Sequence, residues 1–416
     1  YEEYMPFVLE RFSASRLINK KWATKDINSL ETSLIAFNKL QKSYLNYIMN
    51  LDQFQYYLNP NLIISNSNKK YFFAKYHALL LAMNGYHALH PNNRKFYWNT
   101  IENLFEPIYY DGDLNFIQID DLSPYHTKQE KKDEELFLSE FKNINFSLLL
   151  KDILLIKNEG NFLEDFSNYT LTNKLVANEI LISKIDILSK NIKHIEELTN
   201  SFKETQDNII NKNFNQLTKK IIEETKKFKF EQIYVSIKKN TNQQSYEIKC
   251  LEKIKCPLNG LITKDQITKL MSQNIFKNKR TMILNLDLGN EKENYTVTST
   301  SIGDIFHSIN AKASYDKLTK KLTLVQNLNT DWFLLKDIKL DDISIYLKGV
   351  NRAEISDMKK QNFNKFGLTG CLNLYNVTMK NISIKSYLGS CEDSINIISS
   401  KGHIKLIEVE DAKSDG

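Results

Sequence analysis

The end of the chain carries a short internal repeat, and such a repeat restricts the fold more than any other pattern in the sequence. Residues 381–384 (Asn-Ile-Ser-Ile) reappear 22 residues later as residues 403–406 (His-Ile-Lys-Leu). Apolar and polar side chains alternate in these segments, which is typical of a strand with one buried face. A similar strand that returns after so short a span predicts that one copy stacks on the next.

The surrounding sequence supports a stacked arrangement. Leu340–Ile345 and Leu374–Met379 look like related strands at other spacings, and Asn occurs at the turns. We therefore expect residues 331–416 to form the start of a right-handed parallel β-helix, with about 22 residues in each coil. A coil cannot bury its inward face alone, so the two or three coils visible here indicate a truncated β-helix.

Acids recur at one position of the repeat, because the shift of 22 residues places Asp393 onto Asp415. Their turns resemble the stacked Asp-containing turns of carbohydrate-acting β-helix proteins. Such acids could bind Ca²⁺ or serve as acid and base on a sugar chain. More often, Asp residues at turns accept backbone hydrogen bonds and have a structural role. The sequence leaves both interpretations open.

A second informative stretch, residues 87–113, predicts a polar loop, a strand, a turn and a second strand that ends in acids. His87 and Asn93 belong to the loop, and the second strand leads into Asp111-Gly112-Asp113. A base-bearing loop with an Asn, followed within about 20 residues by an Asp at a strand end, is how kinase-like sites hold Mg-nucleotide. Asn and Asp supply the hard oxygen ligands that Mg²⁺ requires.

This stretch resembles the catalytic core of CotH-like proteins, a family of atypical kinases named after a spore-coat protein. The most similar segments are Asn93–Tyr97 and Glu106–Gly112, and the resemblance covers at most about the first 120 residues. No glycine-rich loop accompanies it.

The resemblance implies a function and a set of site residues. It implies that Asn93 and Asp111 bind Mg²⁺ and thereby ATP, with Asp113 as a helper. It also implies that phosphate is transferred from ATP to a protein or surface component. Because such transfer depends on positioning and charge neutralisation, we expect the loss of Asp111 to abolish it.

The chain departs from the family at the catalytic base. When residues 91–93 are aligned on the kinase catalytic loop, Ala88 stands where the catalytic Asp belongs. A methyl group cannot accept a hydroxyl proton, whereas His87 or His90 could, because the pKa of imidazole suits base catalysis near neutral pH. We take His87 as the candidate base. Alternatively, the domain binds nucleotide without transferring phosphate, or these residues form only a polar surface loop.

The length of 416 residues predicts a multidomain α+β protein rather than one compact core. We expect a partial kinase-like C-lobe over residues 1–125, a spacer of long helices over 126–229, a β-rich module over 230–330, and the β-helix over 331–416. The spacer is nearly free of Gly and Pro, and its apolar residues from Leu181 to Ile195 recur at four- and three-residue steps.

Alternating residues predict the strands of the β-rich module. One expected hairpin joins residues 232–238 to residues 245–251. A second joins residues 281–288 to residues 295–299, around a turn at 290–292.

Composition and charge narrow the classes of partner. The net charge is +6, and basic residues are interleaved with acidic ones, so the sequence does not indicate nucleic-acid binding. No segment approaches the roughly 20 apolar residues of a membrane-spanning helix. Abundant Ile, Asn and Lys with scarce Gly and Pro are typical of an AT-rich, bacterial genome.

The cysteines and the chain ends give information on the cellular compartment of the protein. The four cysteines lack zinc spacing; Cys250 and Cys256 could pair in an oxidising compartment, or the thiols could be free and buried. Both ends look cut, so a signal peptide could have been lost. The β-helix resemblance favours a secreted or cell-envelope protein.

The sequence is compatible with three functions. The favoured one is an atypical kinase fused to a β-helix. The second is a non-catalytic surface or envelope protein that contacts polysaccharide through its β-helix and carries a degenerate kinase-like domain, which Ala88 favours. The third is a polysaccharide lyase or hydrolase that acts through the β-helix.

Overall fold

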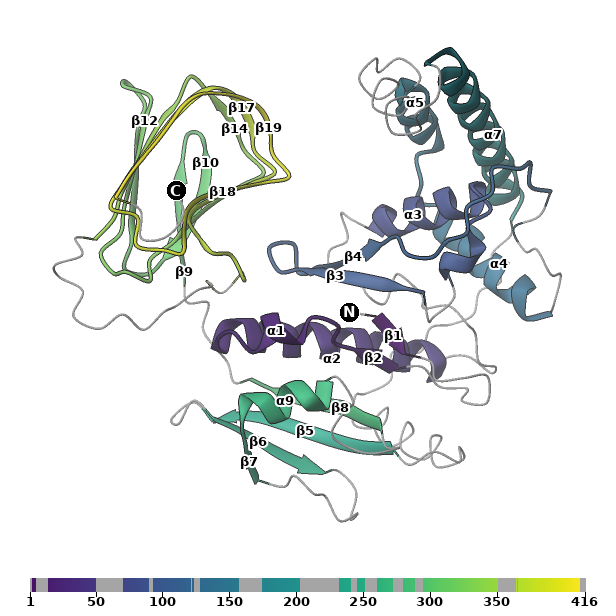
Figure 1. The fold of residues 1–416 in the computed structure, drawn as a ribbon, viewed down its shortest axis with the longest axis horizontal. Helices are drawn as coiled ribbons and strands as arrows, with labels where there is room; N and C mark the ends of the chain where they lie inside the picture. The colour runs from purple at the N-terminus through teal and green to yellow at the C-terminus, as the bar shows by residue number, and fades with distance from the viewer. Residues whose placement is uncertain are drawn as a thin grey trace. The chain divides into compact units, whose positions relative to one another are not determined.

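The computed structural model describes most of the chain, in two compact units. The described residues are 2–4, 14–49, 70–89, 93–120, 122, 128–156, 174–202, 232–240, 245–250, 260–271, 280–288, 295–350, 364 and 366–411. Helices and strands are both abundant, which confirms the predicted mixed α+β class (Figure 1). The first unit comprises residues 1–19, 34–237 and 247–286, and the second comprises residues 20–33, 238–246 and 287–416.

A small antiparallel sheet of the first unit contains the hairpin predicted around residue 100. Its strands are β1 (Glu2–Tyr4), β2 (Ala14–Arg16), β3 (Lys95–Asn99) and β4 (Leu104–Ile108), in the order β2-β1-β3-β4. Asn99 closes the turn, because its side-chain oxygen accepts hydrogen bonds from the backbone NH groups of Ile101 and Glu102, each at 3.1 Å. The strand–turn–strand prediction is therefore confirmed.

Helices build the core beside this sheet. They are α3 (Lys70–Ala82), the short 3-10 helix η3 (Tyr86–Leu89), α4 (Lys128–Phe141), α5 (Phe146–Ile156) and α7 (Lys174–Ser201). One hydrophobic cluster draws buried side chains from all five, so the helices expected as a spacer share a core with α3 and η3. Ile185, Leu188 and Ile192 of α7 are buried in it, as their spacing predicts.

Two further helices precede α3 in the chain. They are α1 (Lys20–Ala23) and α2 (Ile27–Met49). The start of α2 is capped by Asp26, whose carboxylate accepts a hydrogen bond from the backbone NH of Ser29 at 2.8 Å. The Ser29 hydroxyl in turn accepts one from the backbone NH of Asp26 at 3.1 Å. This reciprocal pair satisfies NH groups that a helix start leaves without partners. No helix among the described residues is long and apolar enough to cross a membrane.

A separate four-stranded sheet follows, together with one helix. Its elements are β5 (Gln232–Asn240), β6 (Ser245–Cys250), β7 (Gly260–Ile262), α9 (Lys264–Met271) and β8 (Arg280–Asp287), with strand order β7-β6-β5-β8. The adjacent β5 and β6 agree with the first predicted hairpin. The second predicted hairpin is wrong. β8 borders β5, whereas β9 (Tyr295–Thr300) pairs antiparallel with β10 (Gly303–Ser308) in another sheet.

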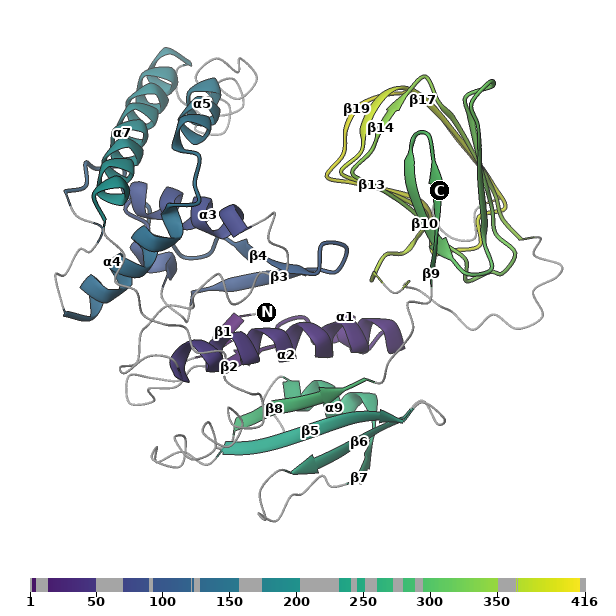
Figure 2. The same cartoon turned by 180° about the vertical axis from the view of Figure 1, so that it is seen from behind.

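The rest of the second unit is built of two sheets with parallel ladders. Their further strands are β11 (Lys312–Asp316), β12 (Lys321–Val325), β13 (Phe333–Lys336), β14 (Lys339–Asp341), β15 (Ser344–Lys348), β16 (Gly370–Tyr375), β17 (Thr378–Tyr387), β18 (Asp393–Ile398) and β19 (Lys401–Glu410). One sheet aligns β13, β16 and β18 in parallel, and the other aligns β12, β15, β17 and β19 (Figure 2). Inward-facing Ile, Leu and Phe side chains form one core between them.

The strand register corrects the repeat length. Thr378 pairs with Lys401 and Ile384 with Ile407, a shift of 23 residues rather than the predicted 22. The shift of 22 holds only where Ile382 pairs with Ile404, beside an irregularity in the ladder. β17 has one extra residue between Met379 and Ile382, and β19 has one between Ile404 and Leu406, so the shift falls to 22 at a single pair and then returns to 23. A sequence comparison without gaps cannot register such paired irregularities.

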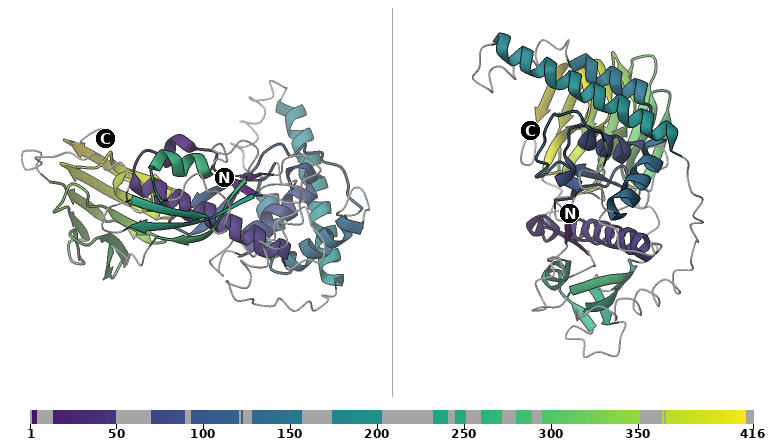
Figure 3. Two further views of the ribbon diagram at one scale, coloured as in Figure 1. Left: turned by 90° about the horizontal axis from the view of Figure 1, so that it is seen from below. Right: turned by 90° about the vertical axis from the view of Figure 1, so that its right-hand side faces the viewer.

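The colour of the stacked strands in the second unit runs from green to yellow along the stack, as Figure 3 shows from two further directions. The segment Leu374–Met379, taken from the sequence as one strand, is two. Residues up to Tyr375 belong to β16, and residues from Thr378 belong to β17. Asn376 turns the chain between them with φ 53°, a conformation that Asn adopts more easily than most residues.

Candidate functional site

The helix η3 presents His87 at the surface of the first unit. Tyr86, Ala88 and Leu89 are buried in the core, so the remaining residue of this short helix faces outward. The side-chain amide of Asn93 donates a hydrogen bond to the main-chain carbonyl of His87 at 3.0 Å. This bond fixes the end of η3 to the entry of β3, and it leaves the amide oxygen of Asn93 available as a ligand.

Asp111 reaches the same place from the other strand of the hairpin. It follows β4, and its Oδ2 lies 3.5 Å from Nε2 of His87. The side chains of His87 and Asp111 are 53% and 57% exposed, respectively. Because β3 and β4 are antiparallel, the start of β3 and the end of β4 lie side by side, as the pairing of Lys95 with Ile108 shows. The hairpin therefore brings His87, Asn93 and Asp111 together.

The turn Asp111-Gly112-Asp113 has an unusual backbone. Asp111 and Asp113 both have φ 48°, the left-handed region that Asp tolerates better than most residues. A Cβ atom on Gly112 would lie 2.4 Å from the ring of Tyr109, so a larger residue between the two acids would have to displace that ring. The side chain of Asp113 is exposed. Strained turns of this kind are enriched at functional sites.

The side chains at this place offer few metal ligands. Among the described residues, no group of three or more His, Cys, Asp and Glu side chains could hold a metal ion. Mg²⁺ commonly takes only one or two protein oxygens and completes its shell with phosphate and water. Asn93 and Asp111 offer one amide oxygen and one carboxylate, which fit that requirement. His90 lies outside the described residues.

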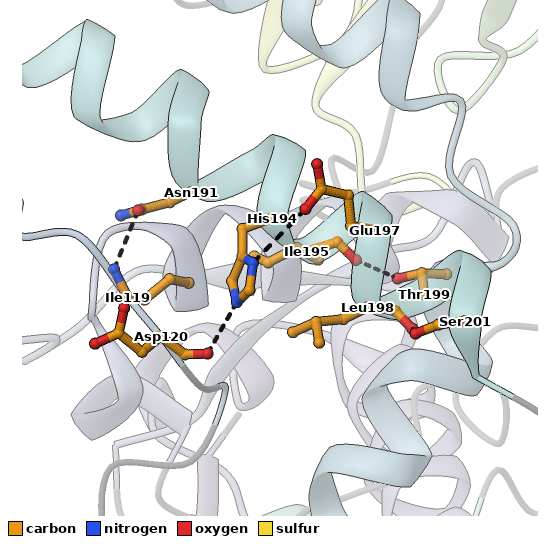
Figure 4. A network of polar contacts seen from close by, with 9 residues as sticks. All are labelled: Ile119, Asp120, Asn191, His194, Ile195, Glu197, Leu198, Thr199 and Ser201. Carbon is orange, nitrogen blue, oxygen red and sulfur yellow. Dashed lines mark hydrogen bonds and ion pairs between the residues drawn. The ribbon is translucent and has the colours of Figure 1, made fainter.

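Sequence reasoning missed the residue that supports the site from behind. Asn191 of α7 is buried, and its amide donates to the carbonyls of Ala82 at 2.8 Å and Ile117 at 2.7 Å. Its oxygen accepts from the backbone NH of Ile119 at 3.2 Å (Figure 4). Asn191 thus ties the end of α3, which leads to His87, to the segment that follows Asp113.

Further bonds hold the same segment. The backbone NH of Asn115 donates to the carbonyl of Met83 at 3.0 Å. Nε2 of His194 lies 2.9 Å from the carbonyl of Asp120, one turn along α7 from Asn191 (Figure 4). In the sequence, an Asn beside the apolar stripe of α7 is the only signal for this arrangement. Periodicity alone predicts that α7 is a spacer helix.

Another buried polar pair lies in the core of the first unit. Nδ1 of His77 on α3 is 3.2 Å from Oε2 of Glu140 on α4, and both side chains are buried. The ring of His77 also contacts the aromatic rings of Phe73 and Phe137. Such a pair satisfies two polar groups that would otherwise be buried at a high cost.

Aromatic side chains lie close to the site as well. Nζ of Lys95 is 3.0 Å from the ring centre of Tyr110, a cation–π contact beside Asp111. Burial raises the pKa of Tyr76, and Tyr109 raises it further, whereas the positive charge of Arg94 lowers it. The surroundings of the hairpin therefore carry fixed positive charge as well as aromatic surface.

Asp393, the described acid of the repeat, has structural partners. The carboxylate of Asp393 accepts a hydrogen bond from the hydroxyl of Thr369. Asn396 donates to the same hydroxyl at 3.1 Å and to the side-chain oxygen of Asn373 at 3.3 Å. This network supports the turn-capping interpretation of Asp393 over the catalytic one. Asp415 lies outside the described residues.

Each cysteine among the described residues forms a disulfide bond. Cys371 and Cys391 are bonded to each other and link the start of β16 to the residues before β18. Cys250 is also disulfide-bonded, whereas Cys256 lies outside the described residues. The buried side-chain amide of Gln326 packs beside the first disulfide, with Nε2 3.1 Å from Sγ of Cys371.

No protein-family model, curated protein or solved structure matches the chain.

Proposed function

We propose that the protein is an atypical kinase of the CotH-like kind, which transfers phosphate from ATP to a protein or surface component. The observation that carries the proposal is the meeting of His87, Asn93 and Asp111 at one end of the β3–β4 hairpin. Three polar residues that are separated in sequence converge there, and two of them, Asn93 and Asp111, are the residues to which the kinase resemblance assigns Mg²⁺.

Asn93 and Asp111 would hold Mg²⁺ and, through it, the phosphates of ATP. When bound, Mg²⁺ neutralises charge on the phosphates and orients them for transfer. The NH₂ group of the Asn93 side chain donates to the main-chain carbonyl of His87, so the amide oxygen is the atom that would bind Mg²⁺. Asp113, exposed on the same turn, is the candidate second carboxylate.

His87 would act as the general base. A neutral imidazole can accept the proton of an attacking hydroxyl. The carboxylate of Asp111, with Oδ2 3.5 Å from Nε2 of His87, would orient the ring. The exposure of both side chains leaves room for a large phosphoacceptor.

Titration calorimetry with Mg-ATP tests this proposal. We expect Mg²⁺-dependent binding to the 416-residue chain and its loss in Asp111→Ala. The matched control is Asp152→Ala, which removes an exposed acid of α5 in the same unit. Binding that survives Asp111→Ala, or no binding by the folded wild-type chain, would exclude the proposed nucleotide site.

A second candidate function is a non-catalytic protein of the cell surface. The observation that favours it is the burial of Ala88, since a methyl group packed into the core supplies no acid at the usual base position. In that case the chain would bind polysaccharide through the second unit. Retention on insoluble polysaccharide together with the absence of ATP binding would favour this function over the first.

We infer that the second unit is the start of a parallel β-helix. Parallel pairing of strands in chain order and one continuous inward core support this assignment. The disulfide between Cys371 and Cys391 supports a secreted or envelope location, because disulfides persist in oxidising compartments. Labelling of free thiols in the protein purified without reductant tests this location. Complete labelling of both cysteines would contradict it.

A further inference from the structure

The sheet that contains β12, β15 and β17 carries lysine and tyrosine side chains on its outer face. The Leu and Ile side chains of these three strands are buried in the core of the second unit. Because successive side chains of a strand point to opposite faces of a sheet, the residues next to them point outward. These outward residues include Lys321 of β12, Tyr346 and Lys348 of β15, and Lys385 and Tyr387 of β17. The three lysines and Tyr387 are exposed to solvent.

The register of the strands brings these side chains together. Tyr346 pairs with Lys385, and Lys348 pairs with Tyr387, so each tyrosine has a lysine beside it on the neighbouring strand. Because neighbouring strands are about 5 Å apart, the four side chains form one cluster. Nζ of Lys321 lies 5.0 Å from the ring centre of Tyr346, which adds a third lysine to the cluster.

A fourth lysine, Lys312 of β11, extends the cluster. It pairs with Val325 of β12, which in turn pairs with Lys348. Lys312 and Lys348 therefore lie two strands apart, a distance of about 10 Å. We call this surface the Lys/Tyr face, and it comprises Lys312, Lys321, Tyr346, Lys348, Lys385 and Tyr387.

Positive charge predominates on the Lys/Tyr face. The ladders align three outward residues on each of β11, β12, β15 and β17, and of these twelve residues four are lysines and one, Asp316, is an acid. The carboxylate of Asp316 accepts hydrogen bonds within the turn after β11. Glu408 of β19 neutralises one of the lysines, since its Oε2 lies 2.6 Å from Nζ of Lys385. The other three lysines give the face a net positive charge, which favours an anionic partner.

The form of the surface argues against two other kinds of ligand. Sites for small molecules are concave, whereas the outer face of a sheet is open. A peptide can be added as a strand only at a free sheet edge, and β15 and β17 each have a neighbouring strand on both sides. The partner that fits best is therefore an extended anionic polymer that lies across the face.

An acidic polysaccharide has the chemistry that this face would recognise. The CH groups on one side of a sugar ring are apolar and pack against an aromatic ring, which removes apolar surface from water. The carboxylates of uronic acids are attracted to lysine ammonium groups, which are mobile point charges on flexible stems. Lys348 and Tyr387 place both kinds of contact side by side.

We propose that the Lys/Tyr face binds an acidic polysaccharide, with its carboxylates on the lysines and its sugar rings on Tyr346 and Tyr387. The proposal gives a surface and a ligand class to the polysaccharide binding of the second candidate function. It does not require the loss of kinase activity, because no residue of the face belongs to the nucleotide site.

Affinity electrophoresis in gels that contain polygalacturonate, alginate or methyl-esterified polygalacturonate tests the proposal. We expect both acidic polymers to retard the chain. The esterified polymer keeps the sugar rings but lacks the charge, so it should retard the chain much less. Lys348→Ala and Tyr387→Ala should each raise the Kd for the acidic polymers at least about fivefold. Tyr387→Phe keeps the aromatic ring and should bind nearly as the wild type does.

The matched control is Lys339→Ala, which removes an exposed lysine of β14 outside the Lys/Tyr face and should leave binding unchanged. Thermal unfolding of all variants shows that they are folded. Calorimetry with Mg-ATP should give one result for the wild type and all variants, so a failure of the nucleotide site is distinguished from a failure of this face.

Three results would overturn the proposal. The first is a folded wild-type chain that neither acidic polymer retards, including one that binds only anionic lipid vesicles or single-stranded DNA. The second is equal retardation by the acidic and the esterified polymers. The third is unchanged binding in both Lys348→Ala and Tyr387→Ala.

Discussion

Nε2 of His87 lies 3.5 Å from Oδ2 of Asp111, across the open end of the β3–β4 hairpin. Neither residue belongs to a strand of the hairpin. His87 lies in the short helix before β3, and Asp111 lies in the turn after β4. The contact is exposed, so it contributes little to folding stability.

His87→Gln should separate nucleotide binding from transfer. Glutamine keeps a polar side chain but cannot accept a proton, so we expect the affinity for Mg-ATP to change less than about threefold, while transfer falls about 10²- to 10⁴-fold. Calorimetry and transfer of labelled phosphate to candidate acceptors measure the two effects. Unchanged transfer would remove His87 as the base without affecting the metal ligands.

Asn191→Leu should destabilise the first unit and loosen the turn that carries Asp111. The change leaves the carbonyls of Ala82 and Ile117 and the NH of Ile119 without their partner, at about 2–4 kcal/mol in total. Denaturant unfolding measures the loss. Asn200→Leu, at an exposed site of the same helix, is the control. Equal effects of the two substitutions would contradict the role of Asn191.

The sequence was most informative where structure is local. The hairpin and its acids follow from the alternation and turn residues between Arg94 and Asp113, and antiparallel pairing then forces the loop and the acidic turn together. No comparable rule finds Asn191, whose bond to Ala82 spans 109 residues of the chain. Periodicity identifies the buried stripe of α7, but it cannot say which backbone a buried amide will meet.

Strand partners were harder to predict than strands. β8 and β9 were both expected, yet local alternation does not determine the neighbour of a strand, and β9 turns back onto β10 through residues 301–302. Likewise, the repeat at 381–384 identified two stacked strands, but its shift of 22 residues holds only for the pair Ile382–Ile404 in an irregular part of the ladder, whereas the other pairs have a shift of 23. Such errors matter because a slip of one residue exchanges the two faces of a strand.

Loss of one partner of the buried pair His77–Glu140 should cost more than loss of both. Glu140→Leu or His77→Leu alone leaves a polar group buried without its partner, at about 3–5 kcal/mol. The double variant buries only apolar groups, and its free energy of unfolding should be closer to that of the wild type. A double-mutant cycle by denaturant unfolding measures the coupling, and strictly additive losses would show that the pair is not coupled.

Asp316→Asn should destabilise the second unit at neutral pH but not in acid. The carboxylate of Asp316 accepts hydrogen bonds from the hydroxyl of Thr319 at 2.7 Å and from the backbone NH of Leu318 at 2.9 Å, across the turn between β11 and β12. The bond from Thr319, followed by the one from Leu318, lowers the pKa of Asp316 below its ordinary value of 3.8.

The direction of the pH dependence follows from this lowered pKa. A carboxyl group whose pKa is lower in the folded state stabilises the fold above its unfolded pKa, and this contribution is lost as the pH falls through the folded pKa. The Tm of Asp316→Asn should therefore lie below that of the wild type at pH 7, and the difference should shrink below about pH 3.8. Thr319→Val, which removes one donor to the carboxylate, should show a smaller difference of the same sign. A Tm difference that stays constant between pH 7 and pH 3 would show that the charge of Asp316 does not stabilise this turn.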